Sequence, residues 1–176
     1  TPLYTGKAQK PEVSVAFLTS EGQLLLQEGV DYTISYSNNV NASVVNADGS
    51  LAAGAKGTVK GKGNFAGKAG AYFSIAPISL VGQDGNFADY ITEETVSMVK
   101  YSGKAVKPAV KLYFTNENGT QVLLKAGKDY IVKSDSVGEK GKTVEGTYTI
   151  QGITNSKKGC NFTGSITLPI WISDEK

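Results

Sequence analysis

Two glycine-rich stretches are the first residues of this sequence that could do chemistry. Residues 136–143 read Ser-Val-Gly-Glu-Lys-Gly-Lys-Thr and end like a triphosphate-binding loop, and residues 61–66 read Gly-Lys-Gly-Asn-Phe-Ala, a dinucleotide-binding pattern. Each pattern binds phosphate only where a helix follows and directs its N-terminal N–H groups at the anion. Residues 147–150 are strand-like instead, and Ser136 stands where the first pattern requires glycine. We therefore predict a hairpin connection at each place and no bound cofactor.

Oxygen ligands for a cation are offered by Asp84, Asn86 and Asp89. Calcium sites between tandem β-domains use such side chains, but this stretch is shorter and less acidic than an EF-hand loop. A solvated turn explains the same residues, because Asp, Gly and Asn are typical of turns. The sequence predicts the turn and leaves these three residues as a candidate calcium site; no other metal site is expected.

Asp31 and Asp129 occur in the same setting, Gly-x-Asp-Tyr, at two places in the chain. A catalytic acid is one interpretation. An Asx-type turn, in which the carboxylate accepts backbone N–H groups, is the other, and turn chemistry alone accounts for both copies. We predict structural turns at Asp31 and Asp129 and no catalytic residue.

Trp171 and Tyr113 are the candidate ligand-binding aromatics. Trp171 alternates with the apolar Ile170 and Ile172, so its side chain is predicted to point away from the core. Exposed aromatics can stack on sugars or contact a partner, and they also cover sheet edges. Cys160 is the one cysteine and has no cysteine partner within the chain for a disulfide. A Lys–Asn crosslink also stays open, since it needs a buried lysine that sequence does not reveal.

The charge composition excludes several function classes. The chain has 176 residues, with 18 Lys+Arg, all of them lysine, against 16 Asp+Glu, and it has no histidine. Without histidine there is no Ser-His-Asp triad. Without arginine the chain lacks the side chain that binds phosphate or guanine through two hydrogen bonds at once. A net charge of +2 without a basic stripe argues against a nucleic-acid partner, and no apolar run is long enough for membrane insertion.

An internal repeat organises the elements that must position these residues. Residues 4–11 recur as 101–108, residues 29–32 recur as 127–130 (129 − 31 = 98), and residues 64–67 recur as 161–164. The copies follow one another in the same order, which indicates a duplication. Extra residues fall near 38–50 in the first copy and near 153–158 in the second, where loops absorb insertions.

Each copy is predicted to consist of short strands. Val13, Val15 and Phe17 alternate with polar or small residues, as do 110–114, 32–36 and 166–172. Glycines separate these runs, and no apolar stripe of helical period and length occurs. The sequence therefore predicts an all-β chain of two tandem antiparallel sandwiches, residues 1–77 and 78–176.

The motifs Tyr-Thr-Gly-Lys…Pro, Gly-x-Asp-Tyr and Gly-x-Gly-Asn-Phe-x-Gly resemble a tandem bacterial immunoglobulin-like repeat of large secreted and cell-surface proteins. The resemblance implies two immunoglobulin-like β-sandwich domains that act as stalks, spacers or adhesion modules. The second copy departs from the motif, because Lys133-Ser134-Asp135 replaces Ser-Tyr-x-Asn and an insertion splits its last block. These departures argue against a ligand common to both copies.

From this resemblance we expect a non-enzymatic structural or adhesion module of an exported bacterial surface protein, extracellular or on the cell surface. Its expected partners are other repeats or domains of the same chain, a host protein or a glycan. A carbohydrate- or host-protein-binding module is the first alternative, and a glycoside hydrolase is the remote one. The second copy has a lead segment, residues 78–100, where the first has only residues 1–3. We expect the first domain to be truncated at its N-terminus, with an exposed edge.

Overall fold

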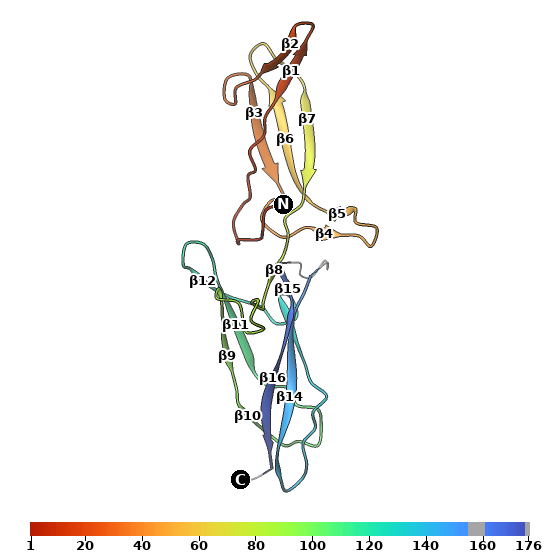
Figure 1. Cartoon of the computed structure of the whole chain (residues 1–176), viewed down its shortest axis with the longest axis vertical. Coiled ribbons are helices and arrows are strands. Elements are labelled where there is room, and N and C mark those ends of the chain that lie inside the picture. Colours follow the sequence, from red (N-terminus) through yellow and green to blue (C-terminus); the bar gives the residue numbers. More distant parts are fainter. Residues whose placement is uncertain (155–160, 175–176) are drawn as a thin grey trace. The chain divides into compact units, whose positions relative to one another are not determined.

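The computed structural model describes residues 1–154 and 161–174. The chain divides into two compact units, residues 1–76 (unit 1) and residues 77–176 (unit 2). All regular structure in the described residues is β-strand, which confirms the all-β prediction (Figure 1). Within this part of the chain, no helix is long and apolar enough to cross a bilayer.

Unit 1 is built around one three-stranded sheet in the order β3-β6-β7. Its other strands form two short hairpins, β1-β2 and β4-β5. The second hairpin lies in the region of the predicted insertion near residues 38–50. The strands are β1 (Ala16–Thr19), β2 (Gly22–Leu25), β3 (Tyr32–Ser37), β4 (Val44–Val45), β5 (Leu51–Ala53), β6 (Ala55–Gly61) and β7 (Lys68–Phe73).

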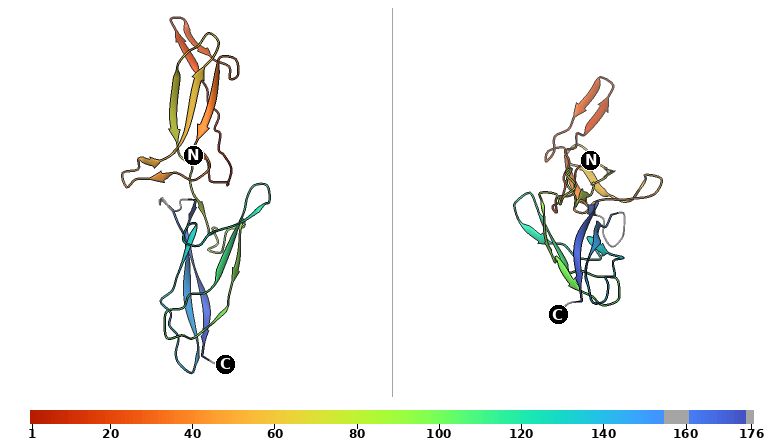
Figure 2. Two further views of the ribbon diagram at one scale, coloured as in Figure 1. Left: turned by 180° about the vertical axis from the view of Figure 1, so that it is seen from behind. Right: turned by 60° about the horizontal axis from the view of Figure 1, so that its bottom comes forward.

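Unit 2 has a four-stranded sheet in the order β10-β16-β14-β13 and a three-stranded sheet in the order β12-β11-β9. Both views of Figure 2 show these as separate layers, an arrangement consistent with a β-sandwich. A short parallel pair, β8-β15, completes the unit. The strands are β8 (Ile78–Ser79), β9 (Ile91–Thr95), β10 (Met98–Lys100), β11 (Val110–Thr115), β12 (Gln121–Leu123), β13 (Tyr130–Lys133), β14 (Thr143–Gly152), β15 (Phe162–Thr163) and β16 (Ser165–Ser173).

The core of unit 2 follows from the period-2 alternation of its strands. Successive side chains of a strand point to opposite faces, so the apolar residues of β14 and β16 share one face. Tyr148, Ile150, Ile170 and Ile172 are each at most 2% exposed. The opposing sheet contributes its own buried alternating residues, chiefly Leu112 and Phe114.

Glycines at corresponding turns adopt the conformation predicted for them. Gly67 has a φ of 96° and Gly164 a φ of 83°, a region that residues with a Cβ rarely occupy. Each turn is closed by the same backbone hydrogen bond: Gly61 N–H donates to Gly67 O at 3.0 Å, and Gly152 N–H donates to Gly164 O at 2.9 Å. The repeated sequence blocks therefore make the same local structure in both units.

Candidate functional sites

The Gly-x-Asp-Tyr turns have the same hydrogen bonds in both units. Asp31 Oδ2 accepts the backbone N–H of Gln27 at 2.8 Å, and Asp129 Oδ2 accepts that of Lys125 at 2.8 Å. The backbone of each aspartate bonds the same residue in return. Asp31 N–H donates to Gln27 O and Asp129 N–H donates to Lys125 O, both at 2.8 Å. Each aspartate therefore closes its own loop ahead of a strand. This geometry supports the structural interpretation of both carboxylates.

The tyrosine after each aspartate ties its strand to the neighbouring segment. Tyr130 O–H donates to Val110 O at 2.8 Å, and Tyr32 O–H donates to Val13 O at 3.1 Å. Both rings are buried. Burial raises the pKa of the Tyr130 phenol above its usual 10.0, and the nearby Asp129 carboxylate raises it further. In each unit the tyrosine ring lies in the core and its hydroxyl is hydrogen-bonded to the backbone.

The loop proposed as a calcium candidate satisfies its own acceptors. Asp84 Oδ1 accepts the backbone N–H of Asn86 at 3.0 Å, and Asp84 Oδ2 accepts the Asn86 side-chain amide at 2.8 Å. These hydrogen bonds hold the pKa of Asp84 below its usual range. No group of three acidic, histidine or cysteine side chains gathers anywhere in the described residues, Asp89 included. The loop therefore has the geometry of an Asx turn, which the sequence also allows.

The two candidate aromatics lie on different sheets of unit 2. Trp171 belongs to β16 and is 46% exposed, and its register partners are Met98 and Glu145. Tyr113 belongs to β11, where it lies opposite Thr92 and Leu123, and it is only partly exposed. They therefore do not form one stacking platform. Cys160 lies outside the described residues.

The lysines bear on the crosslink hypothesis. None of the lysines in the described residues is buried, although a Lys–Asn isopeptide bond needs a buried amine. The amines that have acidic partners make surface ion pairs, such as Lys111 Nζ with Glu94 Oε2 at 3.1 Å. This pairing holds the pKa of Glu94 below its usual range and raises that of Lys111. Exposed pairs of this kind contribute little to stability.

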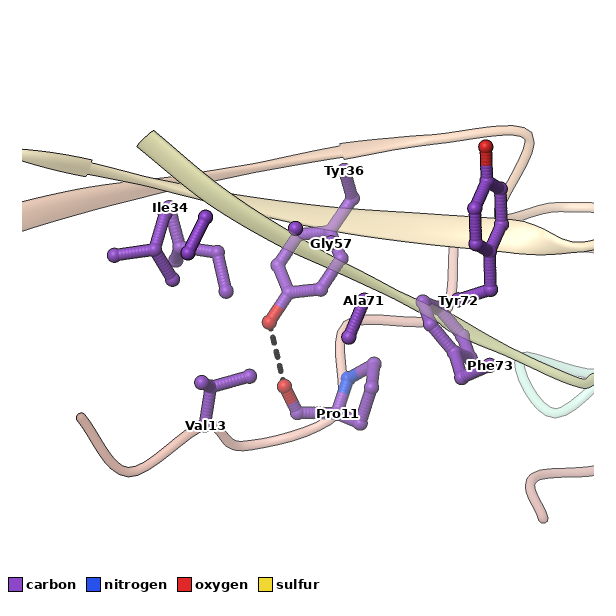
Figure 3. Close-up of a pocket in the computed structure, with 11 residues that line it drawn as sticks. Pro11, Val13, Ile34, Tyr36, Gly57, Ala71, Tyr72 and Phe73 are labelled. Carbon is purple, nitrogen blue, oxygen red and sulfur yellow. Dashed lines mark hydrogen bonds between the residues drawn. The ribbon is translucent and has the colours of Figure 1, made fainter. Parts of the chain in front are cut away.

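An apolar cleft in unit 1 is the site that the sequence did not predict. It has a volume of about 320 Å³ and lies between Pro11 and Val13 on one wall and Ile34, Ala71 and Phe73 on the other (Figure 3). Its described lining contains no carboxylate and no amine, and its polar side chains are Tyr36 and Tyr72. Such a surface can bind apolar side chains, but it offers no acid or base for catalysis.

Side-chain size explains why this cleft occurs in unit 1. The cross-strand pair Tyr32–Gly61 of unit 1 corresponds to the pair Tyr130–Gly152 of unit 2. Counting back four residues along each strand makes Gly57 of β6 the counterpart of Tyr148 of β14. Ala71 lies opposite Gly57, whereas Leu168 lies opposite Tyr148. Unit 1 thus has a glycine and an alanine where unit 2 packs a tyrosine and a leucine. The lost side-chain volume leaves the inner face of its sheet open.

Tyr36 partly replaces the missing ring from the neighbouring strand. It lies directly opposite Gly57, and its ring is 3.4 Å from the place a Cβ on Gly57 would take. Its hydroxyl donates to Pro11 O at 2.5 Å, and its ring meets Phe73 edge-on at 6.2 Å (Figure 3). Burial raises the pKa of the Tyr36 phenol, as do Glu28 and Tyr32. The ring narrows the cleft without filling it.

Comparisons with protein-family models, with curated proteins and with solved structures gave no match.

Proposed function

We propose that this chain is a non-enzymatic structural or adhesion module of an exported bacterial surface protein, made of two tandem immunoglobulin-like repeats. One observation carries the proposal: the residues that the two units share make structural contacts. Asp31 and Asp129 each bind the backbone of their own turn, and the following tyrosines hold the next strand. A repeated unit whose common residues maintain its fold suits a spacer that presents other domains.

Exposure of the native protein on intact cells tests the surface assignment. Cells of the source organism are treated with a protease, and antibodies against the chain follow its loss. We expect the chain to be cleaved while a cytoplasmic marker stays intact. A chain that is degraded only after cell lysis would contradict a surface location. A chain found entirely in the culture medium would support export and contradict a location on the cell surface.

The binding-module alternative is favoured by one observation, the exposure of Trp171 beside Met98. Met98 is 55% exposed, and the two residues pair between β10 and β16. An exposed aromatic next to a flexible apolar side chain can contact a sugar face or a protein. A glycan array and a host-protein array, each run with the chain and with Trp171→Ala, separate the two functions. Binding lost in Trp171→Ala would favour the alternative, and the absence of specific binding by both chains would favour the spacer.

A further inference from the structure

The residues that cover a pair of phenylalanines differ between the units. Phe114 and Phe162 in unit 2 are 5% and 1% exposed. The lead segment of this unit, residues 78–100, covers them: Ile78 pairs with Phe162, Ile91 pairs with Phe114, and the Tyr90 ring meets Phe114 edge-on at 6.1 Å. The unit 1 counterparts, Phe17 and Phe65, make the same ring contact, yet Phe17 is 51% exposed.

The lead segment also supplies a strand, β9, that has no equivalent beside unit 1 in the described residues. β9 pairs antiparallel with β11, and Thr115 N–H donates to Tyr90 O at 2.8 Å. β1, the counterpart of β11, pairs only with β2. Leu26 N–H donates to Val15 O at 2.9 Å, so alternation turns the amides of Ala16 and Leu18 toward the open edge. An exposed edge of this kind accepts an added strand.

The apolar cleft lies where the lead segment of unit 2 crosses between its sheets. Thr95 lies opposite Val110, and three residues further on Met98 lies opposite Trp171. The counterparts of Val110 and Trp171 are Val13 and Ser74, so the crossing corresponds to the gap between Val13 and the end of β7. Val13 and Phe73 are both walls of the cleft. Beyond the crossing, Leu3 bridges Ala76 in parallel, as Lys100 bridges Ser173.

We propose that the open side of unit 1 is a strand-acceptor site for an extended segment of the same kind as residues 78–100. The segment pairs antiparallel with β1 at Ala16 and Leu18 and packs apolar side chains on Phe17 and Phe65. It then crosses at the cleft and ends beside Leu3. Its recognition chemistry is that of β-strand addition, in which main-chain hydrogen bonds give affinity and alternate apolar side chains give specificity.

The test joins residues 78–99 of this chain directly before Leu3 of the full protein. Amide hydrogen exchange is measured by NMR at Ala16 and Leu18, with Phe17, whose amide faces β2, as the internal reference. A matched control carries the added segment with Ile91→Asp and Leu80→Asp in that added copy alone; both residues are buried in unit 2. We expect exchange at Ala16 and Leu18 to slow at least tenfold with the added segment, and to stay unchanged with the control.

Equal exchange rates at Ala16 and Leu18 in the chain with the added segment and in its matched control would overturn the proposal. A second result would also overturn it. If the same amides of the unmodified chain became protected as the protein concentration rises, and sedimentation showed dimerisation over the same range, the occupant would be a second copy. A synthetic peptide of residues 78–100 that slows the same exchange in trans would support the proposal. The measurement is independent of where the native protein resides, so its failure leaves the proposed function standing.

Discussion

Phe17 and Phe65 pack edge-to-face with their ring centroids 5.6 Å apart, and Phe114 and Phe162 repeat this contact at 5.8 Å. The ring geometry is thus common to both units. The burial of the rings differs between the units, because the lead segment covers Phe114 and Phe162 whereas Phe17 is open to solvent. The same aromatic contact should therefore contribute different amounts to the stability of each unit.

We expect Phe162→Ala to lower the free energy of unfolding of unit 2 by about 3–5 kcal/mol, because it empties a fully buried site. Phe65→Ala should cost unit 1 only about 1–2 kcal/mol, because its ring is partly exposed and removal leaves no closed cavity. Denaturant unfolding of the full chain measures both. Trp171 is the one tryptophan of the chain, so its fluorescence reports unit 2, and far-UV circular dichroism reports both units. Equal costs for the two variants would contradict the difference in burial.

Asp31→Ala and Asp129→Ala should each destabilise their own unit by about 1 kcal/mol, since each leaves a turn N–H without its carboxylate acceptor. Asp129→Asn is the matched control: it keeps an oxygen acceptor at the same place and should recover most of the loss. Only Asp129→Ala should move the Trp171 transition. A shift of that transition in Asp31→Ala would show that the units do not unfold independently, and two unchanged variants would reopen the catalytic interpretation.

Gly61→Ala and Gly152→Ala should each cost about 2 kcal/mol, because the new Cβ would meet backbone atoms that cannot move aside cheaply. The closest atoms are Phe65 O at 2.7 Å and Phe162 C at 2.8 Å. Gly57→Ala, on the same strand as Gly61, is the control. Its Cβ would meet the Tyr36 ring at 3.4 Å, so this change should be neutral or stabilise by about 0.5 kcal/mol. Thermal unfolding compares all three, and a Gly57→Ala variant as unstable as Gly61→Ala would contradict the steric account.

Alkaline pH should destabilise unit 2. Burial raises the pKa of Tyr130 and of Tyr90 above the usual 10.0 in the folded state. The unfolded chain therefore loses these protons at a lower pH than the folded chain. The resulting stability is fully present below pH 10 and is lost as the pH rises through the folded-state pKa values.

Denaturant unfolding of unit 2, followed by Trp171 fluorescence at pH 9, 10 and 11, measures the slope of its stability against pH. Tyr130→Phe should flatten it above pH 10. The same variant should also lose about 1 kcal/mol at neutral pH with the hydrogen bond to Val110 O, and the offset at pH 7 separates this effect from the slope. An unchanged slope in Tyr130→Phe would assign the alkaline transition to other groups.

Local patterns predicted many of the strands and turns, although Val13 and Val15 of one predicted strand lie ahead of β1, which begins at Ala16. The alternation of residues 166–172 predicted the face on which Ile166, Ile170 and Ile172 are buried. The turn at Gly67, with its positive φ, and the backbone role of Asp129 were also predicted, because each depends on residues close in sequence. Both glycine-rich loops connect antiparallel strands, β6 to β7 and β13 to β14, as the missing helix signal indicated.

The apolar cleft could not be predicted in the same way. It arises where Gly57 and Ala71 from two strands come to face Pro11 from a distant segment, and small residues in a strand give no signal of what lies opposite them. A comparison of the aligned copies position by position, which sets Gly57 against Tyr148, would have shown the loss of volume. The location of Trp171 and Tyr113 on different sheets likewise depends on strand order.

The sequence by itself determined that this chain is all-β, and that the shared Gly-x-Asp-Tyr blocks form turns. Only the tertiary structure decided which of the alternating apolar runs are covered by another segment. Val13, Val15 and Phe17 alternate just as Val110, Leu112 and Phe114 do, yet Phe17 is half-exposed and Phe114 is buried. The physical reason is that a strand's alternation fixes the direction of its side chains, whereas their burial depends on a segment supplied from elsewhere, here residues 78–100 over Phe114.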